Sequence, residues 1–198
     1  MAFESNRLIF REYEKTDFPL FYQVFSDERV MRYAYMNVCS SEPEILPYFH
    51  QILANNSLGE NERKAYEYAV FSREDGAYVG FADIVLEHKN TDGGVAEIGY
   101  FLLPSCWGAG YATEMAQTLL NFCFMHLHLH RVCASCNRAN ASSEKIMQKI
   151  GMLKEGEFRK ARYKNGKWED ELRYAILAEE WKRYPSTGSC APQTRKLK

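Results

Sequence analysis

Apolar and polar side chains alternate with two different periods along this 198-residue chain. Short runs rich in β-branched and aromatic residues have the composition of strands, and one such run ends at Pro104. Glycines follow at Gly108 and Gly110, and a helical period begins soon afterwards. This stretch therefore predicts a strand, a glycine turn and a helix. The apolar face of that helix consists of Ala112, Met115, Ala116, Leu119, Leu120 and Cys123.

The same patterns predict the elements on either side of this stretch. Helices are expected to begin near residues 17, 41, 112 and 141, and the polar residues 55–64 are expected to form a loop. The first helix should bury a stripe made of Leu20, Phe21, Val24 and Phe25. Strands are expected at residues 7–13, 65–71, 78–86, 98–103, 131–136, 153–163 and 171–177.

Residue types that favour helix ends mark the first two helices. Thr16 or Asp17 can cap the first, because a short polar side chain can accept from the free amides of a first turn. Ser41 and Glu44 have the spacing of a capping box ahead of the second. Pro47 could instead move the start of that helix to its own position, since proline donates no backbone hydrogen bond.

Composition adds little to this picture but excludes some partners. With 46% hydrophobic and 26% charged residues, residues 1–184 are expected to form one globular domain, and residues 185–198 a disordered tail. A net charge of -1 gives no electrostatic basis for binding nucleic acid or a membrane surface. No apolar run could span a bilayer, and the first residues lack a signal-peptide pattern. A cytoplasmic protein is therefore expected.

Six cysteines at irregular spacing raise the question of a metal site. The segment from His126 to Cys136 contains three histidines and a Cys-x-x-Cys pair. If residues 131–136 form a strand, however, Cys133 and Cys136 face opposite sides, because they are an odd number of residues apart. A zinc site needs four ligands that converge with tetrahedral geometry. We therefore expect buried, reduced thiols and no metal.

The glycine turn has the properties of an anion-binding site. The first N–H groups of a helix have no intrahelical partner and lie at the positive end of its dipole, so they can hold a phosphate group. Gly108 and Gly110 would let the anion approach the backbone closely, because no Cβ stands in the way. An ordinary tight turn remains the alternative for Gly-x-Gly alone. A P-loop is excluded, because the chain lacks Gly-x-x-x-x-Gly-Lys-Ser/Thr.

Three further motifs accompany the turn Ser-Cys-Trp-Gly-Ala-Gly. They are Asn-Arg-Leu-Ile-Phe-Arg-Glu at residues 6–12, Asn-Ala-Ser-Ser at 140–143 with Gln-Lys-Ile-Gly-Met at 148–152, and Asp-Glu-Leu-Arg-Tyr at 170–174. Together they resemble the GNAT superfamily of N-acetyltransferases, and the first and last resemble its ribosomal-protein alanine N-acetyltransferase branch. The resemblance implies an α/β (α+β) fold with a mixed, mostly antiparallel sheet of about seven strands flanked by helices. In that fold the fourth and fifth strands splay apart.

The resemblance also implies where acetyl-CoA, the acetyl donor, binds. Pantetheine pairs with backbone between the splayed strands, and the turn amides hold the pyrophosphate. Ser105 and Ala109 stand where many relatives carry basic or amide side chains, so this turn must rely on its amides. The implied cofactor-binding residues are Phe101, Leu102, Leu103, Trp107, Gly108, Ala109, Gly110, Tyr111, Ala112, Asn137, Asn140 and Ser143.

Catalytic roles follow from the same resemblance. Ser143 has the position that lies near the thioester sulfur in this branch, where its hydroxyl can protonate the leaving thiolate. Asn140, Ser142 and Ser143 could also act only as helix caps. Glu97 is the first candidate for the general base and Asp83 the second. Glu97 could instead be a solvated or ion-paired strand residue.

The implied reaction is direct transfer of an acetyl group to a primary amine within a ternary complex. Arg162 occupies a position at which some relatives carry a catalytic glutamate, so water or another carboxylate would have to serve. The first expected acceptor is a protein N-terminal α-amine, and the alternative is a small-molecule amine or an antibiotic. A non-catalytic acyl-CoA-binding module on the same fold is a further alternative. The protein could act as a monomer or a homodimer.

Overall fold

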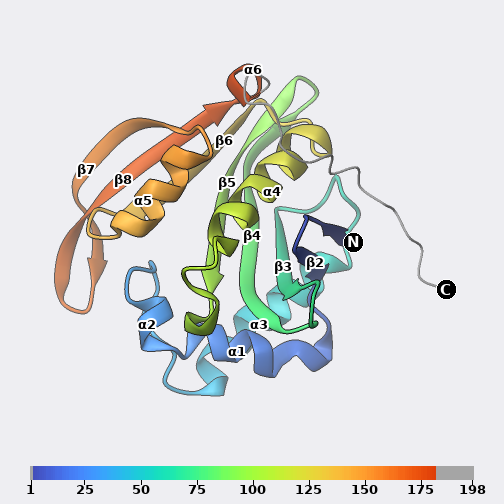
Figure 1. The fold of residues 1–198 in the computed structure, drawn as a ribbon, viewed down its shortest axis with the longest axis vertical. Coiled ribbons are helices and arrows are strands. Elements are labelled where there is room, and N and C mark those ends of the chain that lie inside the picture. Colours follow the sequence, from blue (N-terminus) through green and yellow to red (C-terminus); the bar gives the residue numbers. More distant parts are fainter. Residues whose placement is uncertain (1, 182–198) are drawn as a thin grey trace.

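The computed structural model describes residues 2–181, which form one sheet with helices on both faces (Figure 1). The sheet has eight strands in the order β1-β2-β3-β4-β5-β6-β8-β7, and only β5 and β6 are parallel. The expected mixed, mostly antiparallel α/β fold is confirmed. The additional strand is the short β1 (Ala2–Glu4), which has too few residues to show a period. Residues 185–198, expected to be a disordered tail, lie outside the described residues.

The first half of the sheet is an antiparallel series from β2 (Leu8–Glu12) to β5 (Gly93–Leu102). Between them, β3 (Ala65–Ser72) and β4 (Tyr78–Asn90) form the expected hairpin. β4 extends four residues beyond the expected end at residue 86, where a register irregularity interrupts its pairing with β5. The extension is polar and exposed, so the apolar pattern could not reveal it.

The second half contains β6 (Arg131–Asn137), β8 (Lys167–Leu177) and β7 (Leu153–Lys164). β7 and β8 form a hairpin whose turn, Asn165 and Gly166, has φ values of 47° and 76°. An asparagine followed by a glycine suits two left-handed positions in succession, which explains the predicted turn. The hairpin projects past α2 (Glu28–Met31) at the side of the molecule (Figure 1).

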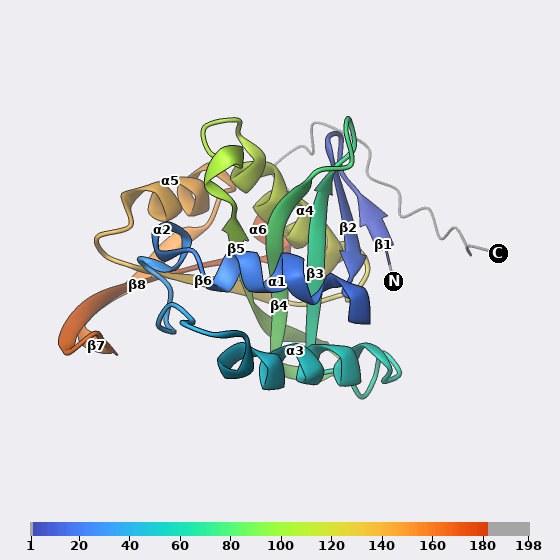
Figure 2. The same ribbon diagram turned by 90° about the horizontal axis from the view of Figure 1, so that it is seen from below.

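Helices cover the two faces of the sheet separately (Figure 2). α4 (Tyr111–Met125) and α5 (Ala141–Lys149) lie on one face, where Met115, Leu119 and Cys123 are fully buried. α1 (Phe18–Phe25) and α3 (Glu42–Asn56) lie on the other face and enclose a second cluster rich in aromatic rings. The short α6 (Ala178–Trp181) follows β8. Within residues 2–181, no helix combines the length and apolarity needed to cross a membrane.

The first two predicted helices correspond to α1 and α3 and begin where the sequence predicts, but the cap of α1 differs from the predicted one. Asp17 stands at the N-cap of α1 without a side-chain cap, because its carboxylate binds Arg11 instead, at 2.7 Å. α3 begins at Glu42 after Ser41, so Pro47 does not set its start. Pro47 is the sixth residue of α3, where proline removes one backbone hydrogen bond at a cost, and the helix nevertheless continues through it. The buried stripe of α1 consists of Phe21, Val24 and Phe25, with Leu20 only partly buried.

Candidate active site

β5 and β6 separate in the middle of the sheet. Their parallel ladder pairs Val95, Ala96 and Glu97 with three residues of β6 and ends at Cys133. Beyond this point β5 continues to Leu102 without pairing to β6. We call this divergence the split. The splay expected between the fourth and fifth predicted strands, residues 98–103 and 131–136, is thereby confirmed.

The glycine turn lies between the end of β5 and α4. After the 3₁₀ turn η2 (Pro104–Cys106), Gly108 and Gly110 have φ values of 79° and 82°, a region that costs residues with a Cβ about 1–2 kcal/mol. Gly110 is the N-cap of α4 and has no side chain with which to bond the first-turn amides. The amides of Tyr111 and Ala112 therefore have no intrahelical acceptor. The predicted strand, glycine turn and helix are confirmed, and the turn is exposed.

The fold brings a cation to this turn that local sequence does not provide. Arg7, just before β2, donates from Nη1 to the carbonyl oxygen of Ala109 at 3.0 Å. Its Nε forms an ion pair with Glu114, in the first turn of α4, at 2.7 Å. The guanidinium also lies 4.6 Å from the centre of the Tyr111 ring. Arg7 therefore braces the turn and places positive charge beside it, although 102 positions separate it from Ala109.

The backbone at the end of β5 is partly engaged within the chain. The Leu103 N–H donates to Val79, and its carbonyl oxygen accepts from Cys106, both at 2.9 Å. The Leu102 carbonyl oxygen accepts from the indole Nε1 of Trp107 at 2.9 Å. A carbonyl oxygen can accept two hydrogen bonds, so Leu102 keeps one lone pair for a ligand. Phe101 is the register partner of Phe81, and its backbone groups point toward β4, because hydrogen-bonding directions alternate along an antiparallel pair. The backbone predicted to pair with pantetheine thus narrows from residues 101–103 to Leu102.

The turn from β6 into α5 is held by two asparagines. Asn137 is buried, accepts from the Ala139 N–H at 2.8 Å and donates to Glu169. Asn140 is the N-cap of α5 and accepts from the Ser143 N–H at 3.2 Å. Asn140 is therefore the side chain that caps α5, whereas Ser142 is exposed and neither serine occupies the N-cap position. The Ser143 hydroxyl thus remains free of the capping interaction.

Several carboxyl groups lie on the face of the sheet turned toward α1 and α3, opposite the face that α4 and α5 cover. Glu67 and Asp83 are register partners on β3 and β4, and Asp83 pairs in turn with Gly99 on β5. A Cβ on Gly99 would lie 2.3 Å from Oδ1 of Asp83, so the absent side chain provides space for this carboxyl. Glu97 makes no hydrogen bond or ion pair with the described residues, which removes the ion-paired interpretation. Its side chain faces away from Ala96 and Ile98, which lie in the core under α4.

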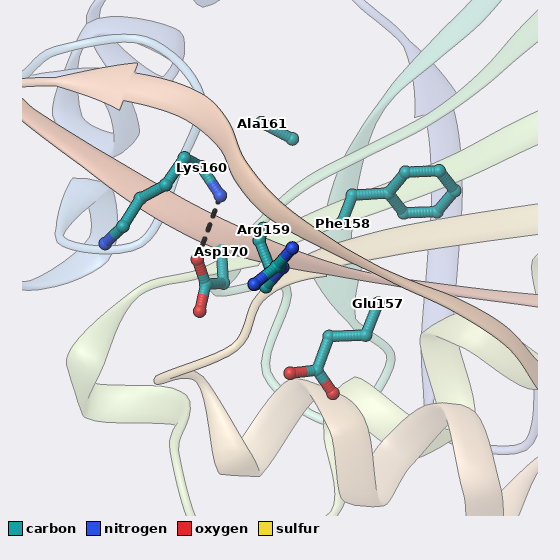
Figure 3. Close-up of a pocket in the computed structure, with 6 residues that line it drawn as sticks. All are labelled: Glu157, Phe158, Arg159, Lys160, Ala161 and Asp170. Atoms are coloured by element: carbon teal, nitrogen blue, oxygen red, sulfur yellow. Dashed lines mark hydrogen bonds between the residues drawn. The ribbon is translucent and has the colours of Figure 1, made fainter.

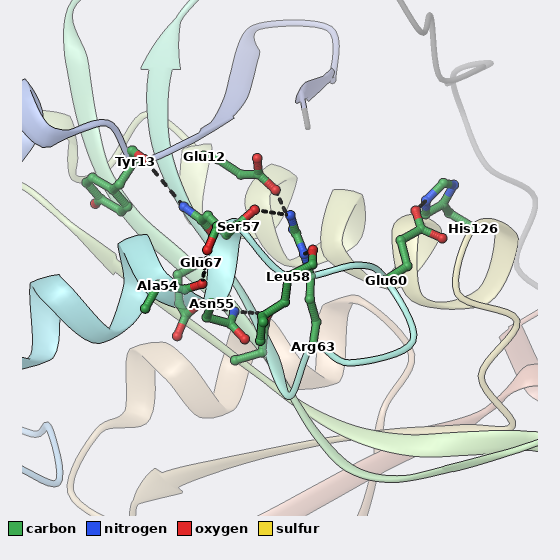
Figure 4. A network of polar contacts seen from close by, with 12 residues as sticks. Glu12, Tyr13, Ala54, Asn55, Ser57, Leu58, Glu60, Arg63, Glu67 and His126 are labelled. Atoms are coloured by element: carbon green, nitrogen blue, oxygen red, sulfur yellow. Dashed lines mark hydrogen bonds and ion pairs between the residues drawn. The ribbon is translucent and has the colours of Figure 1, made fainter.

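Burial changes the acidity of two of these carboxyls. It raises the pKa of Asp83 to about 7, and the neighbouring Glu67 and Glu97 add to the rise. It likewise raises the pKa of Glu67 to about 7, opposed by a hydrogen bond from Asn55 at the end of α3 (Figure 4). A carboxyl with such a pKa can accept a proton near neutral pH. The sequence analysis missed Glu67, although a charged residue within an apolar run was an available signal.

A loop after α2 reaches the same face from a distant part of the chain. Tyr35 donates from its hydroxyl to Glu171 on β8, a carboxylate that is 1% exposed. Arg173 donates to the same carboxylate at 2.7 Å. Arg162 lies 3.9 Å from the centre of the Tyr35 ring and donates to the Tyr33 carbonyl oxygen at 3.0 Å. Arg162 therefore holds this loop in place, and this structural role explains why a basic residue stands at position 162.

Glu171 and Tyr35 also belong to the electrostatic surroundings of the split. Burial raises the pKa of Tyr35, and the Glu171 and Glu97 carboxylates add to the rise, so both carboxylates lie near one phenol. Local sequence could not have identified this group, because 136 positions separate Tyr35 from Glu171. Residues from β5, β8 and the loop after α2 thus meet on the face of the split that is turned toward α1 and α3.

Two further features are the cysteines of β6 and a hollow on the β7–β8 hairpin. Cys133 is partly exposed and Cys136 is buried, as the alternation along β6 requires. No cluster of three or more potential metal ligands is found among residues 2–181. A hollow on the hairpin is shown in Figure 3, where the Lys160 N–H donates to Asp170 at 2.9 Å. It is lined by Glu157, Phe158, Arg159, Lys160, Ala161 and Asp170.

Sequence comparisons relate most of the chain to known proteins. Residues 7–153 match the family model described as an acetyltransferase (GNAT) domain. The uncharacterized N-acetyltransferase YnaD of Bacillus subtilis is 34% identical over 181 residues, which cover 91% of this chain and 99% of that protein. The putative ribosomal N-acetyltransferase YdaF of the same species is 35% identical over 86 residues, or 43% of this chain and 47% of that protein.

Solved structures share the fold. An acetyltransferase of the GNAT family from Bacillus anthracis superposes with a TM-score of 0.75 at 30% identity, covering 91% of this chain and 100% of that one. A spermidine N-acetyltransferase from Vibrio cholerae, solved with CoA and spermine, superposes with a TM-score of 0.77 at 19% identity, covering 89% and 99%. At such low identity, the second likeness shows the fold alone.

Proposed function

The chain belongs to the GNAT acetyltransferase family, and we propose that it transfers an acetyl group from acetyl-CoA to the α-amine of a protein N-terminus. N-acetyl transfer is the activity that the family match supports, and the choice of acceptor is our proposal. One observation carries it. The split presents an anion-binding turn at its rim, Ser143 toward one face and the ionisable carboxyls toward the other.

On the donor side, we assign the pyrophosphate to the turn at residues 107–112. Its amides after Trp107 have no acceptor within the described residues and lie at the positive end of α4, and Arg7 adds a charge that local sequence lacks. Pantetheine would follow the unpaired edge of β5 at Leu102. Asn137 and Asn140 would act by fixing the start of α5, since their side chains are committed to that turn.

On the acceptor side, Glu97 or Asp83 would take the proton of the incoming ammonium group. The neutral amine attacks the thioester carbonyl, the C–S bond breaks with its electron pair on sulfur, and a proton reaches that sulfur. Ser143 lies on the thiolate side of the split and would supply this proton. Glu97 lies at the apex of the split, beside its last paired residue of β6, so acid and base would act from opposite faces.

Basicity favours an N-terminal acceptor over a lysine side chain. An α-amine with a pKa near ~8 is roughly one-tenth neutral at pH 7, whereas a lysine with a pKa near ~10.4 is well under one-thousandth neutral. The difference amounts to about 3 kcal/mol that a lysine acetylase must recover. The resemblance of residues 6–12 and 170–174 to the ribosomal-protein branch supports the same choice.

A polyamine is the second candidate, and the carboxyl groups favour it. Glu67, Asp83 and Glu97 occupy neighbouring strands on the acceptor face, and Glu171 lies across the split. Several carboxylates suit an acceptor with more than one positive charge, because opposite charges attract most strongly where water is partly excluded. The structural neighbour that acts on spermidine has the same fold.

A competition between acceptors tests the proposal. Thiol release from acetyl-CoA would be measured with a peptide that begins with alanine, with its N-acetylated counterpart containing one lysine, and with spermidine. We expect the free α-amine to give the highest kcat/KM. A higher kcat/KM for spermidine would replace the first candidate by the second. Tight acetyl-CoA binding without turnover on any amine would identify a non-catalytic module.

A further inference from the structure

Tyr100 and Cys136 are the residues that would face each other if β5 and β6 stayed paired. The ladder matches Ala96 with Val132, and Tyr100 and Cys136 lie four residues beyond these on the two strands. The side chains of all four lie on the face packed under α4 and α5. Because the ladder ends at Glu97, the backbones of β5 and β6 are not bonded at the level of Tyr100.

Ser143 reaches this level from the first turn of α5. Its hydroxyl lies beside both Tyr100 and Cys136, since it lowers the pKa of each against a larger rise caused by burial. The Tyr100 hydroxyl is itself buried and has no hydrogen-bond partner of good geometry. Three elements therefore place two hydroxyls and a thiol around the split, on the face opposite Glu97.

An unpaired buried hydroxyl is costly, so its location matters. Leaving such a donor unsatisfied costs about 1–3 kcal/mol. Tyr66 and Tyr68 also have buried hydroxyls without a partner, but both lie on β3, which β4 separates from β5. Tyr100 differs from them because the Ser143 hydroxyl lies beside it. Burial raises the pKa of Tyr100 to about 12, so this phenol is a hydrogen-bond donor at neutral pH.

We propose that Tyr100 is a positioning residue for the leaving-group step, donating a hydrogen bond to the Ser143 hydroxyl oxygen and so directing the Ser143 proton at the thioester sulfur. This inference rests on the proposed role of Ser143 and is independent of the acceptor. In the free protein the Ser143 O–H can point to the Cys136 sulfur, a weak acceptor, and acetyl-CoA offers a second sulfur in its place.

The proton balance requires no charge on Tyr100. When the C–S bond breaks, sulfur takes the electron pair and the Ser143 proton. The attacking nitrogen loses its proton to the base on the opposite face, and solvent returns a proton to Ser143. Tyr100 keeps its own proton throughout and lowers the barrier by holding one orientation of the Ser143 hydroxyl.

Tyr100→Phe tests this role, with Tyr68→Phe as the matched control. Both substitutions remove a buried hydroxyl that lacks a partner, so neither variant should melt at a lower temperature than the parent protein. We expect Tyr100→Phe to lower kcat about tenfold, a modest share of what general acid catalysis supplies, with the acetyl-CoA Kd changed less than about twofold. Tyr68→Phe should leave kcat unchanged.

A double-variant cycle separates positioning from a structural effect. Because Tyr100 acts through Ser143, adding Tyr100→Phe to Ser143→Ala should slow the reaction no further. Multiplied losses in the double variant would overturn the inference, as would a full kcat in Tyr100→Phe while Ser143→Ala is slow. In both cases the proposed acetyl transfer would stand. The absence of thiol release by the unsubstituted protein with every amine tested would overturn the two together.

Discussion

Glu67 and Asp83 face each other across β3 and β4, and each carboxyl has a pKa of about 7. Burial is the main cause in both, and Glu67 adds to the rise for Asp83 because two neighbouring carboxylates repel. Groups this close titrate as a pair. The acceptor face therefore takes up or releases protons in the pH range where an N-terminal amine begins to lose its own.

The raised pKa of Asp83 makes stability depend on pH. The pKa of Asp83 is about 7 in the folded protein and 3.8 when unperturbed, so the folded state binds its proton more tightly. Stability contributed by this proton is lost as pH rises from about 4 to about 7. Asp83→Asn should remove that loss and stabilise the protein at pH 8 by about 1–3 kcal/mol, measured by denaturant unfolding at pH 5 and 8. The exposed Asp92→Asn is the control, and an equal gain there would refute this explanation.

Glu97 is expected to be the general base. Glu97→Gln should lower kcat by about 10²- to 10⁴-fold, because the variant keeps the shape of the side chain but accepts no proton. It should also move the pKa of Asp83 downward, since the Glu97 charge contributes to the raised value. Rate profiles against pH for Glu97→Gln and Asp83→Asn decide between the two carboxyls. Asp83 is the base if Glu97→Gln keeps its kcat while Asp83→Asn lowers kcat and no longer shows a change of rate with pH near pH 7.

The glycine turn should tolerate no side chain at Gly110. Gly110→Val should weaken acetyl-CoA binding more than about tenfold, because a branched Cβ at the N-cap would stand where the pyrophosphate meets the amides. Gly166→Val is matched in backbone strain, since Gly166 has a φ of 76° and open space around it on the β7–β8 turn. The melting temperature should fall by a similar amount in both variants, but only Gly110→Val should raise the Kd for acetyl-CoA, measured by calorimetry. Equal Kd values in the two would refute pyrophosphate binding at this turn.

Ser143 should matter for rate and Asn140 for stability. Ser143→Ala should lower kcat by roughly 10- to 10⁴-fold, with the lower end expected because a thiolate leaves tolerably well without help. Asn140→Ala should cost about 1 kcal/mol of stability, because its side chain caps α5. Ser142→Ala, at an exposed position, should change neither. Kinetics and thermal melts measure these effects, and a full kcat in Ser143→Ala would leave the hydroxyl without a catalytic role.

The sequence predicted what local patterns can encode. The helical period after Ala112, the glycines before it and the strand alternation that separates Cys133 from Cys136 all depend on residues close together in the chain. The resemblance to the GNAT superfamily that the ordered motifs carry also implied the splay between β5 and β6. A helix start at Pro47, the alternative to a start after Ser41, was wrong, because α3 begins at Glu42 and continues through this proline.

The parts that the sequence did not predict come from contacts between distant segments. Arg7 reaches the glycine turn only because β2 lies at the same end of the sheet as the start of α4. Tyr100 and Cys136 share a level of the split because of a parallel register, which no local period specifies. The cap on α5 was ambiguous among three polar residues, and the geometry at Asn140 resolves it.

Amide hydrogen exchange with and without acetyl-CoA tests the central claim most directly, that the donor binds along the split between β5 and β6. Acetyl-CoA should slow exchange at the unpaired amides of residues 108–112 and at Leu102 on the free edge of β5, because bound oxygens would occupy them. The β7–β8 turn at residues 165–166 should be unaffected. Unchanged exchange at the glycine turn, with protection confined to the hollow at residues 157–161, would contradict the account.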